Sequence, residues 1–123
     1  MDIARLILCS VDFGEMMKFV NADDWESVGR FLSETAVKLE KAGAEAIILC
    51  ANTTHIAADT VQDSVSIPVP HIVDAVAKAI DEQNIKKVEL LGTRFTMERE
   101  FFRERLLGHG IEAITPSAEG RDF

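Results

Sequence analysis

The chain has few cysteines, no tyrosine and no long apolar run. Its 123 residues include 2 cysteines, 3 prolines and 1 tryptophan. Two cysteines are too few for a disulfide framework. Cys9 and Cys50 both lie in apolar stretches, so we expect reduced, buried thiols in a cytoplasmic protein. No apolar run approaches the ~20 residues that a membrane-spanning helix needs, and we expect no signal peptide because the first residues lack its basic, apolar, small-residue order.

Basic residues are also scarce. The chain carries 13 Lys and Arg against 21 Asp and Glu, which gives a formal net charge of −8. Nucleic acids and anionic membranes are polyanions, so we expect neither as a partner. The hydrophobic fraction of 47% and the charged fraction of 28% are ordinary for a soluble globular protein. The length is enough for one modest domain with its own core.

Short apolar runs alternate with amphipathic segments. The apolar runs predict four strands, at residues 4–8, 46–50, 87–91 and 111–114. Apolar residues spaced by three and four predict four helices, at about 24–42, 53–63, 72–83 and 97–107. The order β-α-β-α-α-β-α-β is typical of an α/β fold, with three layers in which a short parallel sheet is flanked by helices. We expect one domain over residues 1–116 and a tail at 117–123.

Several details of these elements can be tested against a structure. We expect a loop over residues 10–14. Asp23 or Asp24 is the predicted N-cap residue of the next helix, and Gly43 is predicted to end that helix. Thr96 is the predicted N-cap residue of the helix over 97–107. The expected apolar face of the helix over 72–83 consists of Ile72, Ala75, Val76, Ala79 and Ile80.

Small polar residues follow three of the predicted strands. They are Ser10 and Asp12, then Asn52, Thr53 and His55, then Thr93 and Thr96. The carboxyl ends of parallel strands lie along one edge of a sheet, so these side chains could together hold an anion or a carboxylate. The alternative is that each one only caps a helix, as Asn and Thr commonly do.

The charged and imidazole side chains give no metal motif. We expect His55 in the first turn of a helix, either solvated or capping; His71 as a packing residue; and His109 as exposed. No Asp or Glu lies at ligand spacing from these histidines, so no metal is expected. Arginines and glutamates alternate between residues 94 and 105, which is typical of a solvated helix face with ion pairs. Arg94, beside Thr93, could meet an anion.

Five segments together resemble the aspartate/glutamate racemase family. They are LCSVDF, CANTTH, IPVPHI, ELLGTRFTMEREFF and GIEAITP, in the family's order and over nearly the whole chain. The resemblance implies a cofactor-independent isomerase with two similar α/β domains and an active site in the cleft between them. Two facing acid/base residues, usually cysteines, would exchange the α-proton of an acidic amino acid. The substrate carboxylates would be held by Asn52, Thr53, Thr93 and Thr96, with His55 nearby.

The chain departs from the family pattern at the catalytic position. Ala51, directly before Asn52, stands where the family usually has its cysteine. Cys50 lies one step earlier, and successive strand side chains point to opposite faces. No catalytic residue is therefore secure, and Cys50 is a weak candidate that we expect to be a buried packing residue. The sequence also begins at what resembles the family's second strand and does not contain the Gly-Cys-Thr motif of its second domain, so we expect the isolated chain to be inactive.

Two other functions fit the sequence less well. The chain could be a non-catalytic module that binds a dicarboxylate or self-associates, because an unpaired sheet edge favours a homo-oligomer. Cys50 and His55 could instead be the nucleophile and base of a hydrolase or transferase. We disfavour that reading because no acid partner lies at a suitable place.

Overall fold

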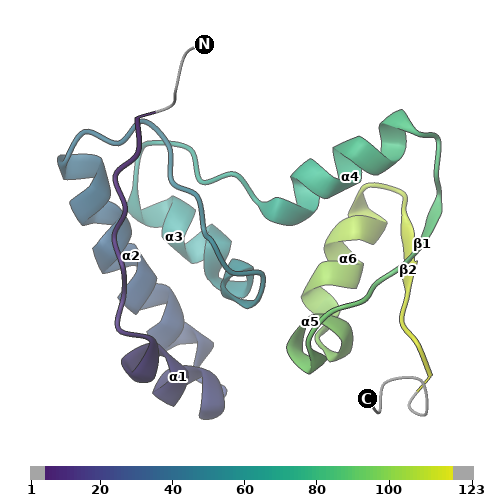
Figure 1. Cartoon of the computed structure of the whole chain (residues 1–123), viewed down its shortest axis with the longest axis horizontal. Helices are drawn as coiled ribbons and strands as arrows, with labels where there is room; N and C mark the ends of the chain where they lie inside the picture. Colours follow the sequence, from purple (N-terminus) through teal and green to yellow (C-terminus); the bar gives the residue numbers. More distant parts are fainter. Residues whose placement is uncertain (1–4, 118–123) are drawn as a thin grey trace. The chain divides into compact units, whose positions relative to one another are not determined.

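A computed structural model describes residues 5–117, apart from the side chain of Arg94 (Figure 1). The chain divides into two compact units, one that ends at Pro70 and one that begins at His71. Each unit is described here by itself. The single domain expected over residues 1–116 stays a prediction, and residues 118–123 of the expected tail lie outside the described part. None of the helices between residues 5 and 117 has the length and apolarity to cross a bilayer.

The first unit is helical. Its elements are α1 (Phe13–Asn21), α2 (Trp25–Lys41), the 3-10 helix η1 (Thr53–Ala57) and α3 (Ala58–Ser64). Asp24 is confirmed as the N-cap of α2, because its carboxylate accepts a hydrogen bond of 3.0 Å from the backbone N–H of Ser27. Gly43 follows the helix with a φ of 92°, a left-handed conformation that glycine adopts without strain. Val28 and Leu32, which lie four residues apart and so on one face of α2, are buried.

Helix α1 was not predicted, and the loop expected over residues 10–14 is wrong from Phe13 onward. The carboxylate of Asp12 accepts a 2.9 Å hydrogen bond from the backbone N–H of Glu15 and so caps the helix. Met16 and Val20, one turn apart, are its buried residues. The pairing of Asp12 with an acidic residue three positions later is a helix-start signal that could have revealed α1 from the sequence.

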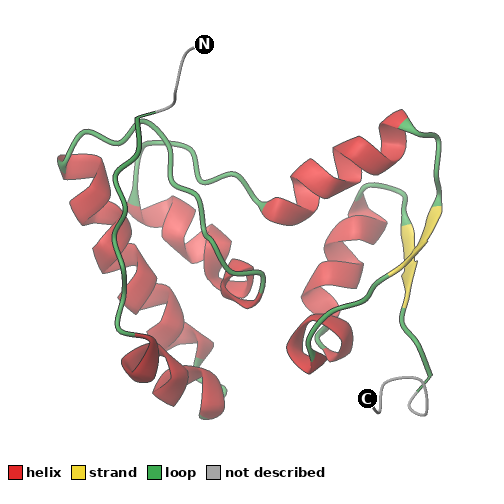
Figure 2. Cartoon of the chain, in the orientation of Figure 1, coloured by secondary structure: helices red, strands yellow, loops and turns green. Residues whose placement is uncertain are grey.

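Two predicted strands are absent from the described residues. Segments 5–8 and 46–50 are extended but are not strands, and Figure 2 shows them as loops. Within the described residues, the backbone hydrogen bond that they make is from the N–H of Ile47 to the carbonyl of Pro68, at 2.9 Å. A strand exists only where a ladder of such bonds joins it to a neighbour. The apolar composition was recognised correctly, but among residues 5–117 no strand pairs with either segment.

The second unit contains the parallel sheet. Its elements are α4 (Ile72–Glu82), β1 (Lys87–Glu89), α5 (Arg94–Glu98), α6 (Glu100–Gly108) and β2 (Glu112–Ile114). Strands β1 and β2 pair in parallel, with Val88 opposite Ala113. A further 2.7 Å bond from the N–H of Leu90 to the carbonyl of Ile114 extends the ladder. The strands predicted near 87–91 and 111–114 are confirmed, as is the α/β class with its short parallel sheet.

A small apolar core holds the second unit together. It consists of Val73, Ala77, Phe102, Leu106 and Ile111. The expected apolar face of α4 is wrong except at Ile80, which packs against this core, because Ile72 and Val76 are exposed. Helix α4 has apolar residues on more than one stripe, so periodicity alone could not indicate which stripe meets α6.

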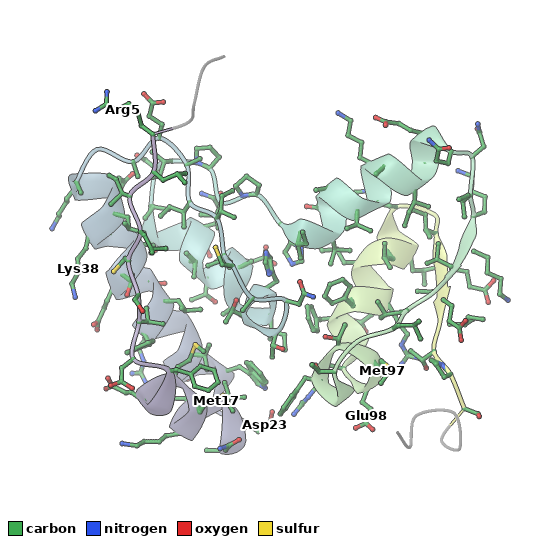
Figure 3. The ribbon with its side chains drawn as sticks, viewed as in Figure 1. Arg5, Met17, Asp23, Lys38, Met97 and Glu98 are labelled. Carbon is green, nitrogen blue, oxygen red and sulfur yellow. The ribbon has the colours of Figure 1, made fainter. Side chains whose placement is uncertain are left out.

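The helix predicted over 97–107 is in fact two helices. Arg99 lies between α5 and α6 with an extended backbone, at φ −80° and ψ 135°. Neither a proline nor a glycine marks this break, so the sequence pattern predicted one helix. The N-cap position before α5 is Thr93, and the expected cap, Thr96, lies inside the helix. Figure 3 shows Met97 and Glu98 on this short helix.

Candidate functional site

The first candidate turn follows the extended segment 46–50 and is held by one backbone carbonyl. The carbonyl oxygen of Ala51 accepts a 2.6 Å hydrogen bond from the Thr54 hydroxyl and lies 2.9 Å from Nδ1 of His55. A carbonyl can only accept, so Nδ1 of His55 carries the proton. The backbone N–H of His55 also donates to the carbonyl of Asn52, at 3.1 Å. These bonds fix the turn from which η1 begins.

His55 is part of this framework. It is only 4% exposed, so the solvated alternative considered from the sequence is wrong. Its ring is held through Nδ1 by the turn itself, which makes it a residue that shapes the turn. Thr54 is also buried, and its hydroxyl donates to the same carbonyl. The signal for Thr54 was the position of its hydroxyl three residues after Ala51, which is common in side-chain-to-backbone turns.

Asn52 and Thr53 occupy the accessible part of this turn. Asn52 stands at the N-cap position of η1, but its side chain makes no capping hydrogen bond. It is exposed, and Thr53 is half-buried. The capping alternative is therefore wrong for Asn52, and its amide can both donate and accept a hydrogen bond at the surface.

The second candidate turn contains Gly92, Thr93 and Thr96. The hydroxyls of the two threonines lie 3.3 Å apart, and Thr96 is buried while Thr93 is exposed. Thr93 makes no side-chain cap with α5. A Cβ at residue 92 would lie 3.0 Å from Cβ of Thr96, so only a glycine fits there without displacement. The glycine thus allows Thr96 to pack beneath the turn and to meet the hydroxyl of Thr93.

The structure brings the candidate residues together within each turn. Asn52, Thr53 and His55 belong to the first unit, and Thr93 and Thr96 to the second. That the two turns share one sheet edge stays a prediction. Of the earlier strand-end residues, Asp12 caps α1 and Ser10 is exposed. The side chain of Arg94 lies outside what the structure describes.

Both cysteines are exposed, so the expectation of buried thiols is wrong. The physical reason is that Cys9 and Cys50 lie at the ends of two extended segments that are not paired into a sheet within the described residues. Sγ of Cys50 lies 3.8 Å from the carbonyl oxygen of Ile48. Nδ1 of His55 faces the carbonyl of Ala51, so the geometry gives no support to a Cys50–His55 nucleophile–base pair. Ala51, also exposed, has no group that could accept or donate a proton.

Acidic and imidazole groups do not gather into a metal site. Among residues 5–117, no group of three or more His, Cys, Asp or Glu side chains could hold an ion. His71 is buried as expected, and its Nδ1 accepts a 3.1 Å hydrogen bond from the N–H of Val73, which caps α4. The packing prediction for His71 is confirmed, and the cap is an addition that the sequence reasoning missed.

A polar cluster joins α4 to α6 in the second unit. The guanidinium of Arg105 donates to both carboxylate oxygens of Asp74, at 2.7 and 2.8 Å, and Nε2 of His109 lies 2.9 Å from the same carboxylate. The hydrogen bonds from Arg105, followed by that of His109, hold the pKa of Asp74 well below its usual range, although burial opposes this. Arg105 was expected on a solvated helix face. The 3.2 Å pair between Arg103 and Glu100 is of the kind that was expected.

Comparison with known proteins gives a consistent result. The family model described as Asp/Glu/Hydantoin racemase matches residues 3–123. The broad specificity amino-acid racemase RacX of Bacillus subtilis (strain 168) is 35% identical over 91 residues, which cover 74% of this chain and 40% of RacX.

Two solved structures are similar over most of the chain. A Yersinia pestis protein assigned as an Asp/Glu racemase has a TM-score of 0.90 and 46% identity, over 94% of this chain and 51% of that one. An aspartate racemase homologue from Pyrococcus horikoshii OT3 has a TM-score of 0.85 and 40% identity, over 94% of this chain and 50% of that one. The chain spans about half the length of these structures. It belongs to the Asp/Glu/hydantoin racemase family.

Proposed function

We propose that this chain supplies part of the substrate site of an amino-acid racemase that acts on aspartate- or glutamate-like substrates without a cofactor. The observation that carries the proposal is the turn at residues 51–55. Its backbone is fixed by Thr54 and His55, and the Asn52 side chain at its surface is not used for capping. Thr93, exposed and hydrogen-bonded to the buried Thr96, is the corresponding group in the second unit. These amide and hydroxyl groups would bind the substrate carboxylates.

The same turn explains why we expect no racemisation by this chain alone. Racemisation requires one group that removes the α-proton and another that returns a proton to the opposite face. Ala51 occupies the position from which the family's cysteine would act and offers no titratable group. Cys50 is exposed and remains the one weak candidate at this turn. The chain would thus contribute binding groups, and the base and acid would have to come from elsewhere.

Deuterium exchange tests the missing chemistry. The pure chain is incubated with L-aspartate and with L-glutamate in deuterated buffer, and α-deuterium is followed by NMR. We expect incorporation no greater than that of the Asn52→Ala variant, because no proton-transfer pair is in place. Incorporation clearly above that control would show that the chain is itself a racemase.

A binding measurement tests the site separately from catalysis. Succinate is titrated into isotopically labelled chain, and amide shifts are followed at Asn52, Thr53, Thr93 and Thr96. We expect saturable shifts that Asn52→Ala weakens and that Asn21→Ala, at an exposed position on α1, leaves unchanged. Binding without deuterium exchange would fit the non-catalytic dicarboxylate-binding alternative for the isolated chain. The absence of any saturable shift at these amides would contradict both.

A further inference from the structure

The break between α5 and α6 has no cause in the local sequence. Arg99 is extended, at φ −80° and ψ 135°, between the two helices. No proline or glycine occurs in residues 94–107. The residues next to the break are Met97, Glu98 and Glu100, and these residue types, like arginine, favour a helix. The local preference for one continuous helix is therefore overridden, which is typical of a functional site.

The start of α6 would gain hydrogen bonds in a continuous helix. In the part of the chain that the structure describes, α6 begins at Glu100 without a side-chain cap. The first four N–H groups of a helix have no partner inside it. In a continuous helix, these four groups would donate to the carbonyls of residues 96–99. The broken form thus lacks intrahelical bonds that a continuous form would have.

The two helices are anchored to different extents. Phe102 and Leu106 of α6 are 6% and 2% exposed and belong to the core of the second unit. In α5, Thr96 is buried, but Phe95 and Met97 are only half-buried. A helix as short as α5 is not stable by itself. Helix α6 is therefore fixed in the core, and α5 is the part that can change its direction.

The connection from β1 is long enough for a continuous helix. Residues 94–99 would extend the start of α6 by ~9 Å, from the helical rise of ~1.5 Å per residue. Residues 91–93 lie between Leu90, the last residue bonded to β2, and α5. Fully extended, residues 91–93 span ~10 Å. The helix could therefore become continuous without breaking the bond from Leu90 to Ile114, but Thr93 would move away from the end of β1.

We propose that residues 94–108 switch between two backbone states, one broken at Arg99 and one a continuous helix, and that only the broken state holds Thr93 beside the end of β1. The role of Thr93 in carboxylate binding rests on the proposed function, whereas the two backbone states do not. A ligand that binds one of two states shifts the population towards that state. A carboxylate bound at Thr93 would therefore stabilise the break, and a chain in the continuous state would bind it poorly.

Two substitutions at Glu100 test the switch on the whole chain. Glu100→Pro is compatible with the broken form, because proline suits the first position of a helix and an extended residue such as Arg99 before it. Proline at this position excludes the continuous helix. Glu100→Ala removes the same carboxylate, with its 3.2 Å pair to Arg103, and leaves both forms possible.

NMR relaxation dispersion measures exchange between the two states on the μs–ms timescale. We expect an exchange contribution at the amides of residues 95–99 in the wild-type chain and in Glu100→Ala, with a helical Cα shift for Arg99 in the minor state. Glu100→Pro should reduce that contribution at least fivefold. Flat profiles in the wild-type chain, an extended minor state at Arg99, or undiminished exchange in Glu100→Pro would overturn the proposal.

Succinate separates this proposal from the proposed function. At saturation we expect succinate to suppress the exchange in the wild-type chain, and we expect Glu100→Pro to bind it at least as tightly as Glu100→Ala. Saturable amide shifts at Asn52 and Thr93 with unchanged exchange, or weaker binding by the proline variant, would overturn the proposal. The absence of any saturable shift would contradict the proposed function, and the exchange in the three ligand-free chains would still decide between one backbone state and two.

Discussion

Single residues decide what the turn at 51–55 can do. Ala51 and Cys50 differ by one position, and the family resemblance predicts that the catalytic position is the one that Ala51 occupies. The sequence showed this difference directly, because it depends on alignment with a motif. It could not show that His55 is buried, because burial depends on packing that a lone histidine does not reveal.

Replacing His55 tests the role of its hydrogen bond. We expect His55→Leu to lower the free energy of unfolding by roughly 1 kcal/mol, because it removes one hydrogen bond to the carbonyl of Ala51. The hydroxyl of Thr54 would still donate to that carbonyl. His55→Asn should lose less, because an Asn amide can reach the same carbonyl. Urea unfolding followed by circular dichroism measures both values. If the two variants lose equal stability, packing of the ring and not the hydrogen bond is what matters.

Helices and strands depend on neighbours to different degrees. The sequence predicted the extents of α2 and α4 well, because helical periodicity is a local signal, but it did not predict which face of α4 is buried. It also predicted β1 and β2, whose ladder partners are each other. Segments 5–8 and 46–50 carry the same apolar signal as β1, but a strand needs a partner that their own residues cannot specify. The break at Arg99 was equally invisible, because no local residue marks it.

The cluster that joins α4 and α6 gives a pH-dependent contribution to stability. Arg105 lowers the pKa of Asp74 in the folded chain, so the unfolded chain takes up this proton first as the pH falls. The contribution is therefore complete above about pH 5 and is lost below it. We expect the wild-type chain to lose roughly 1 kcal/mol more than Asp74→Asn between about pH 5 and pH 3, a modest value because the pair is partly exposed.

Urea unfolding at a series of pH values measures this difference. Asp63→Asn, at an exposed position in the first unit, is the matched control and should follow the wild-type pH dependence. Parallel profiles for wild type and Asp74→Asn would mean that the bidentate pair contributes nothing in solution.

At the scale of the whole molecule, the second unit holds a small apolar core, and the first unit carries two extended apolar segments that are not strands. Its α/β class and family membership followed from the order of motifs, which spans both units. The exposure of the thiols did not follow from the sequence, because Cys9 and Cys50 lie at the ends of two segments that are not paired into strands.

Thiol labelling reports whether the first unit is open in solution. We expect Cys9 and Cys50 both to be alkylated by iodoacetamide in the folded chain, at rates within about tenfold of those in urea, since neither is covered. Mass spectrometry of proteolytic fragments gives the two rates separately. Strong protection of both thiols in the folded chain would contradict an open first unit.

The turn at residues 51–55 also bears on redesign. Its contacts to residue 51 come from Thr54 and His55 and end on the backbone carbonyl, so they do not depend on which side chain residue 51 carries. A thiol introduced by Ala51→Cys would therefore stand on a scaffold that is already assembled. Residue 51 is thus a position whose side chain can be changed without rebuilding the turn around it.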